Sequence, residues 1–102
     1  MQTLDRLGFT VDDLDAELAV ELGLDETLTG VVVTEVAAGS PAMEKGVEPG
    51  DIIRRFGQRR VDSAADLATS VGETLDAGRS GVLLLIERDG RERFVQIGFA
   101  EK

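Results

Sequence analysis

The chain has 102 residues, of which 42% are hydrophobic, and this suits a single domain with a modest core. Its formal net charge of -9 argues against nucleic acid and anionic membranes as partners, because an acidic surface repels phosphate. Histidine and cysteine are both absent, which rules out a Ser-His-Asp or Cys-His catalytic unit within this chain and removes the commonest metal ligand.

No targeting or membrane segment is predicted. The first residues, MQTLDRLG, lack the apolar stretch of a signal peptide, and the longest apolar run, GVLLLI, is too short to span a bilayer. The acidic residues between positions 12 and 21 do not match a calcium-binding loop, so we expect no metal and no cofactor. We expect the chain to be one domain over 1–102, structured from about 5 to 100, within a longer protein.

Three elements are predicted in the first third of the chain. Residues 7–12 alternate as a short strand, in which Gly8 lies between two large apolar residues. Leucines spaced by four residues from 14 to 22 predict a helix that ends at Gly23. The β-branched run at 30–36 predicts the next strand.

The stretch GSPAMEKGVEPGDII, at 39–53, is dense in signals for caps and turns. Ser40 is a good helix N-cap, and Gly46 ends a helix of barely two turns. Pro49 and Gly50 suit the central positions of a type II turn, which leads into a strand over 51–56.

The second half of the chain predicts a hairpin, a helix and a second hairpin. Glycine at 57 favours a type II′ turn with a short return strand at 59–61. An apolar stripe predicts a helix over 63–75, and Asp89-Gly90 between two strand-like runs predicts a type I′ hairpin. The order of elements indicates an α+β domain with a partly open antiparallel sheet, two main helices and a minor one.

The 39–53 stretch resembles the signature of PDZ domains in bacterial proteases, and RLGF at 6–9 resembles their carboxylate-binding loop. Consecutive backbone N–H groups in such a loop form a nest for an anion, and the strand that follows accepts a peptide as an added strand. The resemblance implies a permuted PDZ domain, a partly open β-sandwich or barrel of five to six strands. For RLGF alone, a strand with a packing glycine remains the alternative.

The resemblance also implies the residues of a peptide site. The carboxylate-binding loop comprises Arg6, Leu7, Gly8 and Phe9. The groove beside it is expected to be lined by Thr10, Val11, Leu18, Ala64, Ala68 and Val71. Leu18 is expected to close the pocket floor, and the strand after the loop is expected to have a free edge. Because alanine, not histidine, stands at 64, we expect a preference for apolar C-terminal residues with little demand two positions upstream.

The whole sequence is most similar to the C-terminal PDZ domain of the Do-like, or HtrA-type, periplasmic serine proteases, although Gly57-Gln58 replaces their usual Asn-Gly turn. This implies a non-catalytic module of a trypsin-like protease in the periplasm or cell envelope. Its expected partners are C-terminal peptides or unfolded polypeptides, bound for substrate recognition or regulation. Three alternatives stay open: an assembly module that contacts protease or PDZ domains, and the PDZ domain of an intramembrane zinc protease or of a carboxy-terminal processing protease.

Overall fold

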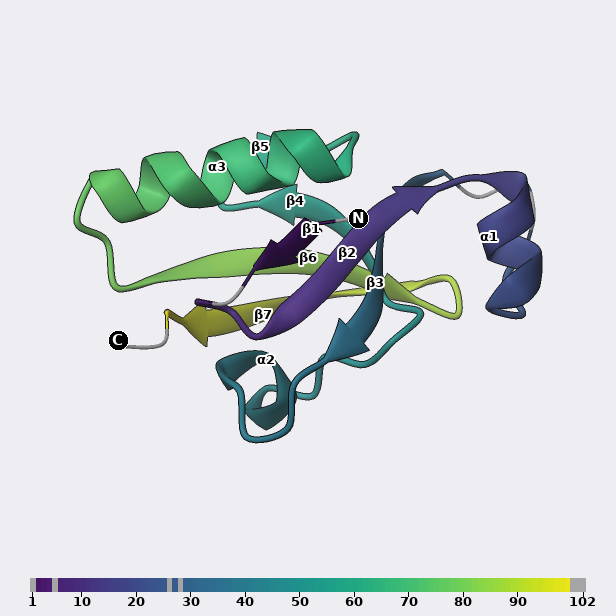
Figure 1. Ribbon diagram of the computed structural model, residues 1–102, viewed down its shortest axis with the longest axis horizontal. Coiled ribbons are helices and arrows are strands. Elements are labelled where there is room, and N and C mark those ends of the chain that lie inside the picture. Colours follow the sequence, from purple (N-terminus) through teal and green to yellow (C-terminus); the bar gives the residue numbers. More distant parts are fainter. Residues whose placement is uncertain (1, 5, 26, 28, 100–102) are drawn as a thin grey trace.

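The computed structural model describes residues 2–4, 6–25, 27 and 29–99, which form an antiparallel sheet with three helices (Figure 1). The strands are β1 (Gln2–Leu4), β2 (Phe9–Leu14), β3 (Gly30–Val36), β4 (Ile52–Phe56), β5 (Arg59–Arg60), β6 (Gly81–Arg88) and β7 (Arg91–Gly98). The helices are α1 (Ala16–Glu21), α2 (Pro41–Glu44) and α3 (Ala64–Asp76).

The strands follow the order β1-β2-β3-β4-β6-β7, and β5 pairs with β4 alone. Every pairing is antiparallel, which confirms the predicted α+β class. Over the residues described, the sheet has seven strands, more than the five to six expected, because β1 was not predicted. The β1 strand forms one edge of the sheet and β7 forms the other.

Capping side chains explain where the two helices nearest the candidate site begin. The Ser40 hydroxyl accepts a hydrogen bond from the Met43 N–H at 3.1 Å, and the Ser63 hydroxyl accepts one from the Asp66 N–H at 3.1 Å. Each bond satisfies a backbone donor that the first turn of a helix leaves without a partner. The N-cap expected at Ser40 is therefore confirmed, and α3 begins at the residue after Ser63.

Two apolar clusters lie on opposite faces of the sheet because strand side chains alternate. Along β3, Val31 and Val33 enter the main cluster, whereas Val32 enters the smaller one. The main cluster packs beneath α3, and Figure 1 shows this helix lying along the sheet. The smaller cluster packs against α1, at the far end of β2 from the loop that precedes it.

Asp51, the aspartate of the Gly-Asp pair in the 39–53 stretch, has a structural role. Asp51 is 1% exposed, and its two carboxylate oxygens accept hydrogen bonds from Arg88 at 2.6 and 2.7 Å. The Glu48 N–H also donates to this carboxylate, at 2.9 Å. The bond to Asp51 raises the pKa of Arg88, so the guanidinium stays charged at any pH the protein meets. The pair fastens the turn before β4 to the end of β6.

Within the described ranges, no helix is long and apolar enough to cross a membrane. The same ranges bring no three acidic side chains together in a way that could hold a metal ion.

Candidate functional site

The loop between β1 and β2 presents two backbone donors to one oxygen. The N–H groups of Leu7 and Gly8 both donate to the carbonyl oxygen of Leu4, at 3.0 and 2.7 Å. Successive N–H groups that converge in this way make an anion-binding concavity. In this structure the chain itself supplies the oxygen that both donors bind. Arg6 lies in the same turn and is half-buried.

The side chain of Ser40 lies where a Cβ on Gly8 would be placed. Gly8 has a φ of +89°, and a Cβ built on it would lie 2.7 Å from the Ser40 hydroxyl oxygen and still nearer the Ser40 Cβ. The backbone ties the same segments together, since the Ala42 N–H donates to the Leu7 carbonyl at 3.0 Å and the Ala37 N–H donates to the Gly8 carbonyl at 2.8 Å. Gly8 is thus a packing glycine, and the Gly-Ser-Pro-Ala segment supports the loop.

The edge of β2 is not free, contrary to the expectation from sequence. The β1 strand pairs with it antiparallel, with partners Gln2–Val11, Thr3–Thr10 and Leu4–Phe9. The cause is the short connection, because only residues 5–8 separate the two strands and the chain reverses directly onto β2. Pairing is reinforced by the hydroxyls of Thr3 and Thr10, which lie 3.3 Å apart.

Helix α3 lies beside β1 and β2 and carries the three helix residues that the resemblance assigned to the groove. Ala64 and Val71 are buried in the main cluster together with Leu4 and Phe9, and the half-buried Ala68 packs against it. The helix contacts both β1 and β2. The loop residues and these three helix residues therefore lie around the outer edge of β2. The β1 strand pairs with that edge and contacts α3. Thr10 and Val11 are both buried on β2.

Leu18 is not brought to this place. It packs in the smaller cluster with Leu14, Val32 and Ile52, on the opposite face of the sheet. Its position on α1 removes it from the floor of the groove, where the sequence analysis expected it. The reason is that the helix 16–21 follows β2 and folds over the other side of the sheet.

One residue that positions the groove was missed. The Asp13 carboxylate, on β2, accepts a hydrogen bond from the Ala64 N–H at 2.7 Å and so caps α3 from across the groove. Asp13 is exposed and lies among acidic residues, a pattern typical of a solvated surface. No local signal reveals the bond, because its partners are 51 positions apart.

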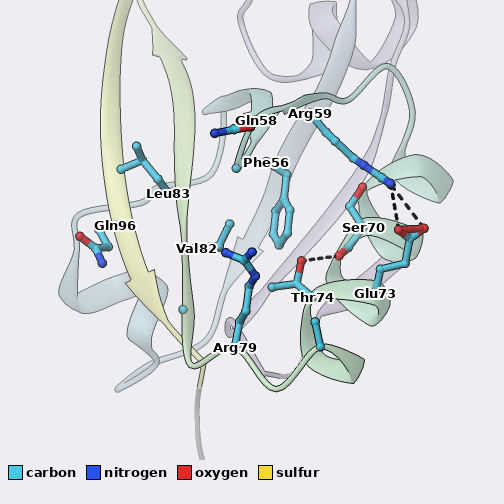
Figure 2. A pocket seen from close by; sticks show the side chains of 13 residues that line it. Phe56, Gln58, Arg59, Ser70, Glu73, Thr74, Arg79, Val82, Leu83 and Gln96 are labelled. Carbon is cyan, nitrogen blue, oxygen red and sulfur yellow. Dashed lines mark hydrogen bonds and ion pairs between the residues drawn. The ribbon is translucent and has the colours of Figure 1, made fainter.

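A separate hollow of 470 Å³ lies at the other end of α3, next to the β4–β5 turn and the start of β6 (Figure 2). Arg59 and Glu73 form an ion pair beside it at 3.0 Å, and the Thr74 hydroxyl donates to the Ser70 carbonyl at 2.8 Å. None of the predicted site residues lines this hollow. Helix α3 therefore lines this hollow with Ser70, Glu73 and Thr74. Its Ala64, Ala68 and Val71 pack with the main cluster instead.

Comparison with known proteins gives one family and a consistent set of relatives. The profile of the PDZ domain family matches residues 6–98. The protein named "Probable periplasmic serine endoprotease DegP-like" from Ectopseudomonas mendocina is 42% identical over 96 residues, which cover 94% of this chain and 19% of that protein. Its namesake from Rickettsia prowazekii is 37% identical over 87 residues, which cover 85% and 16%. The chain therefore spans less than a fifth of these relatives.

Solved structures show the same likeness. The HtrA-type protease AlgW with a decapeptide superposes with a TM-score of 0.81 at 28% identity, over 94% of this chain and 29% of that one. The HtrA3 PDZ domain bound to the phage-derived ligand FGRWV superposes with a TM-score of 0.71 at 25% identity, over 91% and 82%.

Proposed function

We propose that this chain, which belongs to the PDZ domain family, captures the C-termini of peptides by adding them as a strand to β2 beside α3. The observation that carries the proposal is the convergence of the Leu7 and Gly8 N–H groups on one oxygen, at 3.0 and 2.7 Å. A terminal carboxylate fits this nest better than a neutral carbonyl does, because charge-assisted hydrogen bonds are about twice as strong.

The related structures and the groove walls support a ligand with an apolar end. The HtrA3 PDZ domain was solved with a ligand ending in Trp-Val, and AlgW with a decapeptide. Here the walls beside the nest are apolar, and Ala64 and Ala68 are small. Main-chain hydrogen bonds to β2 give affinity, and the apolar wall selects the last side chain.

The setting we propose is a periplasmic serine protease, in which this domain recognises substrates or receives a regulatory peptide. It follows from the curated relatives, which carry that name. The chain itself has neither histidine nor cysteine, so the catalytic unit of such a protease would belong to another part of the protein.

An NMR titration tests the proposal, with a peptide ending in leucine run beside its C-terminally amidated twin. We expect the amide resonances of Leu7, Gly8 and Phe9 to shift with the free acid and much less with the amide. Shifts spread evenly over the surface, or identical responses to both peptides, would contradict carboxylate capture.

A matched pair of helix variants locates the groove. Ala68→Leu fills the wall of α3 that faces β1, and we expect it to weaken binding roughly tenfold through overpacking. Ala65→Leu, on the exposed face of the same helix, should leave affinity unchanged. Charged variants of Phe9 and Val71 are unsuitable as a test, because these side chains are 2% and 6% exposed and a charge there would unfold the core.

Assembly is a second candidate function, and the outer face of β6 and β7 favours it. Leu83 and Phe94 are 42% and 63% exposed there, and Phe94 pairs with Leu85 across the two strands. The exposed Arg55 and Arg60, on β4 and β5, offer positive charge to a second copy whose net charge is -9. Sedimentation of the chain and of Phe94→Glu tests this, since only a dimer built on this face would dissociate in the variant.

A further inference from the structure

Under the function proposed above, a peptide needs the edge of β2 that β1 already covers. One strand edge offers a single row of backbone donors and acceptors, so β1 and a peptide cannot pair with it together. The strand also contacts α3, the second wall of the site. Occupation of the site by β1 and by a peptide are therefore mutually exclusive.

Leu4 holds the position that the last residue of a peptide would take. Its carbonyl oxygen fills the nest of the Leu7 and Gly8 N–H groups. Its side chain is 7% exposed and lies in the main cluster with Phe9 and Val71. The strand runs antiparallel to β2 and ends at the loop, which is the direction a peptide needs to deliver its C-terminus there.

We propose that β1 is a built-in competitor for the peptide site, and that a ligand with a free C-terminal carboxylate binds by displacing it. This inference depends on the proposed function, and it adds that β1 regulates peptide binding by competition. The domain exists in a self-occupied form and a peptide-bound form, and the measured affinity is the intrinsic affinity reduced by the cost of releasing β1.

Competition from β1 increases the preference of the site for peptides with a free C-terminal carboxylate. An internal segment or an amidated peptide offers the nest a neutral carbonyl, which is what Leu4 already supplies. Since β1 is joined to β2 through only four residues, its effective concentration at the site is high. A neutral ligand gains nothing to offset that advantage, whereas a carboxylate gains the stronger, charge-assisted bonds.

The contacts of β1 are few enough for displacement. It is three residues long, and Gln2 and Thr3 are exposed, so Leu4 supplies its buried apolar surface. Strands this short that lie at a sheet edge open at low free energy. When it leaves, the two N–H donors of the loop pass directly to the incoming carboxylate.

The same contacts describe the ligand. Leu4 occupies the terminal pocket, so an aliphatic side chain of similar size fits it. The Thr3 hydroxyl lies 3.3 Å from that of Thr10, so a hydroxyl or other small polar group suits the penultimate position. Gln2 is exposed and sets little demand two positions upstream. A peptide ending in Gln-Thr-Leu with a free carboxylate is therefore the matched probe.

Calorimetric titration of the 102-residue chain with this free-acid peptide and its amide tests the proposal. Leu4→Ala should bind the free acid about tenfold more tightly than the unsubstituted chain, because the competitor loses its buried side chain. Gln2→Ala, in the same strand but exposed, is the matched control and should bind as the unsubstituted chain does. Circular dichroism melting checks that each variant is folded.

A second readout uses the unsubstituted chain and does not depend on the folding of a variant. Cross-strand NOEs between Thr3 and Thr10 should disappear at saturating free-acid peptide. Equal affinity in both chains with persistent NOEs would overturn the competitor and leave peptide binding intact. If neither the unsubstituted chain nor a folded Leu4→Ala variant binds the free-acid peptide, the result contradicts both peptide capture and competition by β1.

Discussion

Gly8 joins two motifs that are distant in the sequence, since it packs against Ser40, 32 positions later. It gives the loop its left-handed backbone, with a φ of +89°, and leaves room for the side chain of Ser40. Ser40 in turn caps α2 through the Met43 N–H. Because Gly8 has no Cβ, Ser40, the N-cap of α2, can pack directly against the loop between β1 and β2. The Gly-Ser-Pro-Ala segment therefore supports the RLGF loop.

Gly8→Ala should destabilise the fold by about 2–5 kcal/mol, which sums left-handed strain and overpacking against Ser40. Gly23→Ala is the matched control, since Gly23 has a φ of +73° but nothing within 4 Å of an added Cβ. That control should cost only the backbone part, about 1–2 kcal/mol. Urea denaturation measures both, and equal midpoints for the two variants would show that Ser40 does not constrain the loop.

Most helices and strands of this fold can be predicted from short stretches of sequence, whereas the occupation of the candidate site by β1 cannot. The strand at 30–36 and the Asp89-Gly90 hairpin follow from β-branched residues and turn chemistry, and positive φ values of 53° and 78° at 89 and 90 agree with the predicted turn. The β1 strand escaped prediction because three residues are too few to show a period. The RLGF loop was predictable from resemblance, whereas its occupation by Leu4 depends on how the chain reverses.

The junction between β2 and α3 depends on a bond that no local pattern encodes. The Asp13 carboxylate satisfies the N–H of the first residue of α3, at 2.7 Å, while Ser63 satisfies the N–H two residues later. The two walls of the groove are thereby fastened together at the end remote from the loop.

Asp13→Ala should lower the free energy of unfolding by about 1 kcal/mol, as for other lost N-caps. It should also loosen α3 against β2, so hydrogen exchange of the first turn of α3 should quicken. Asp13→Asn keeps the acceptor oxygen and serves as the control, with stability and exchange close to those of the unsubstituted chain. If the asparagine variant were as unstable as the alanine variant, the contribution of Asp13 would come from its charge and not from the cap.

At the scale of the whole molecule, the distribution of charge bears on which peptides reach the groove. The net charge of -9 repels acidic ligands at long range. The pairing of β1 also sets a register for any ligand that replaces it, with the last three residues opposite Phe9, Thr10 and Val11. Continued in the same register, the next two residues upstream lie opposite Asp12 and Asp13.

Basic residues at those two upstream positions should therefore strengthen binding. Directly opposed charges across strands contribute about 0.2–1 kcal/mol each, so a peptide ending in Lys-Lys-Gln-Thr-Leu should bind roughly two- to thirtyfold more tightly than one ending in Ala-Ala-Gln-Thr-Leu. The ratio should be largest near 0.02 M salt and approach one near 1 M, where the screening length falls to about 3 Å. Fluorescence anisotropy competition at both salt concentrations measures it. A ratio of one at low salt would show that ligands do not follow the register of β1, whereas a ratio that salt leaves unchanged would indicate packing of the upstream side chains in place of charge.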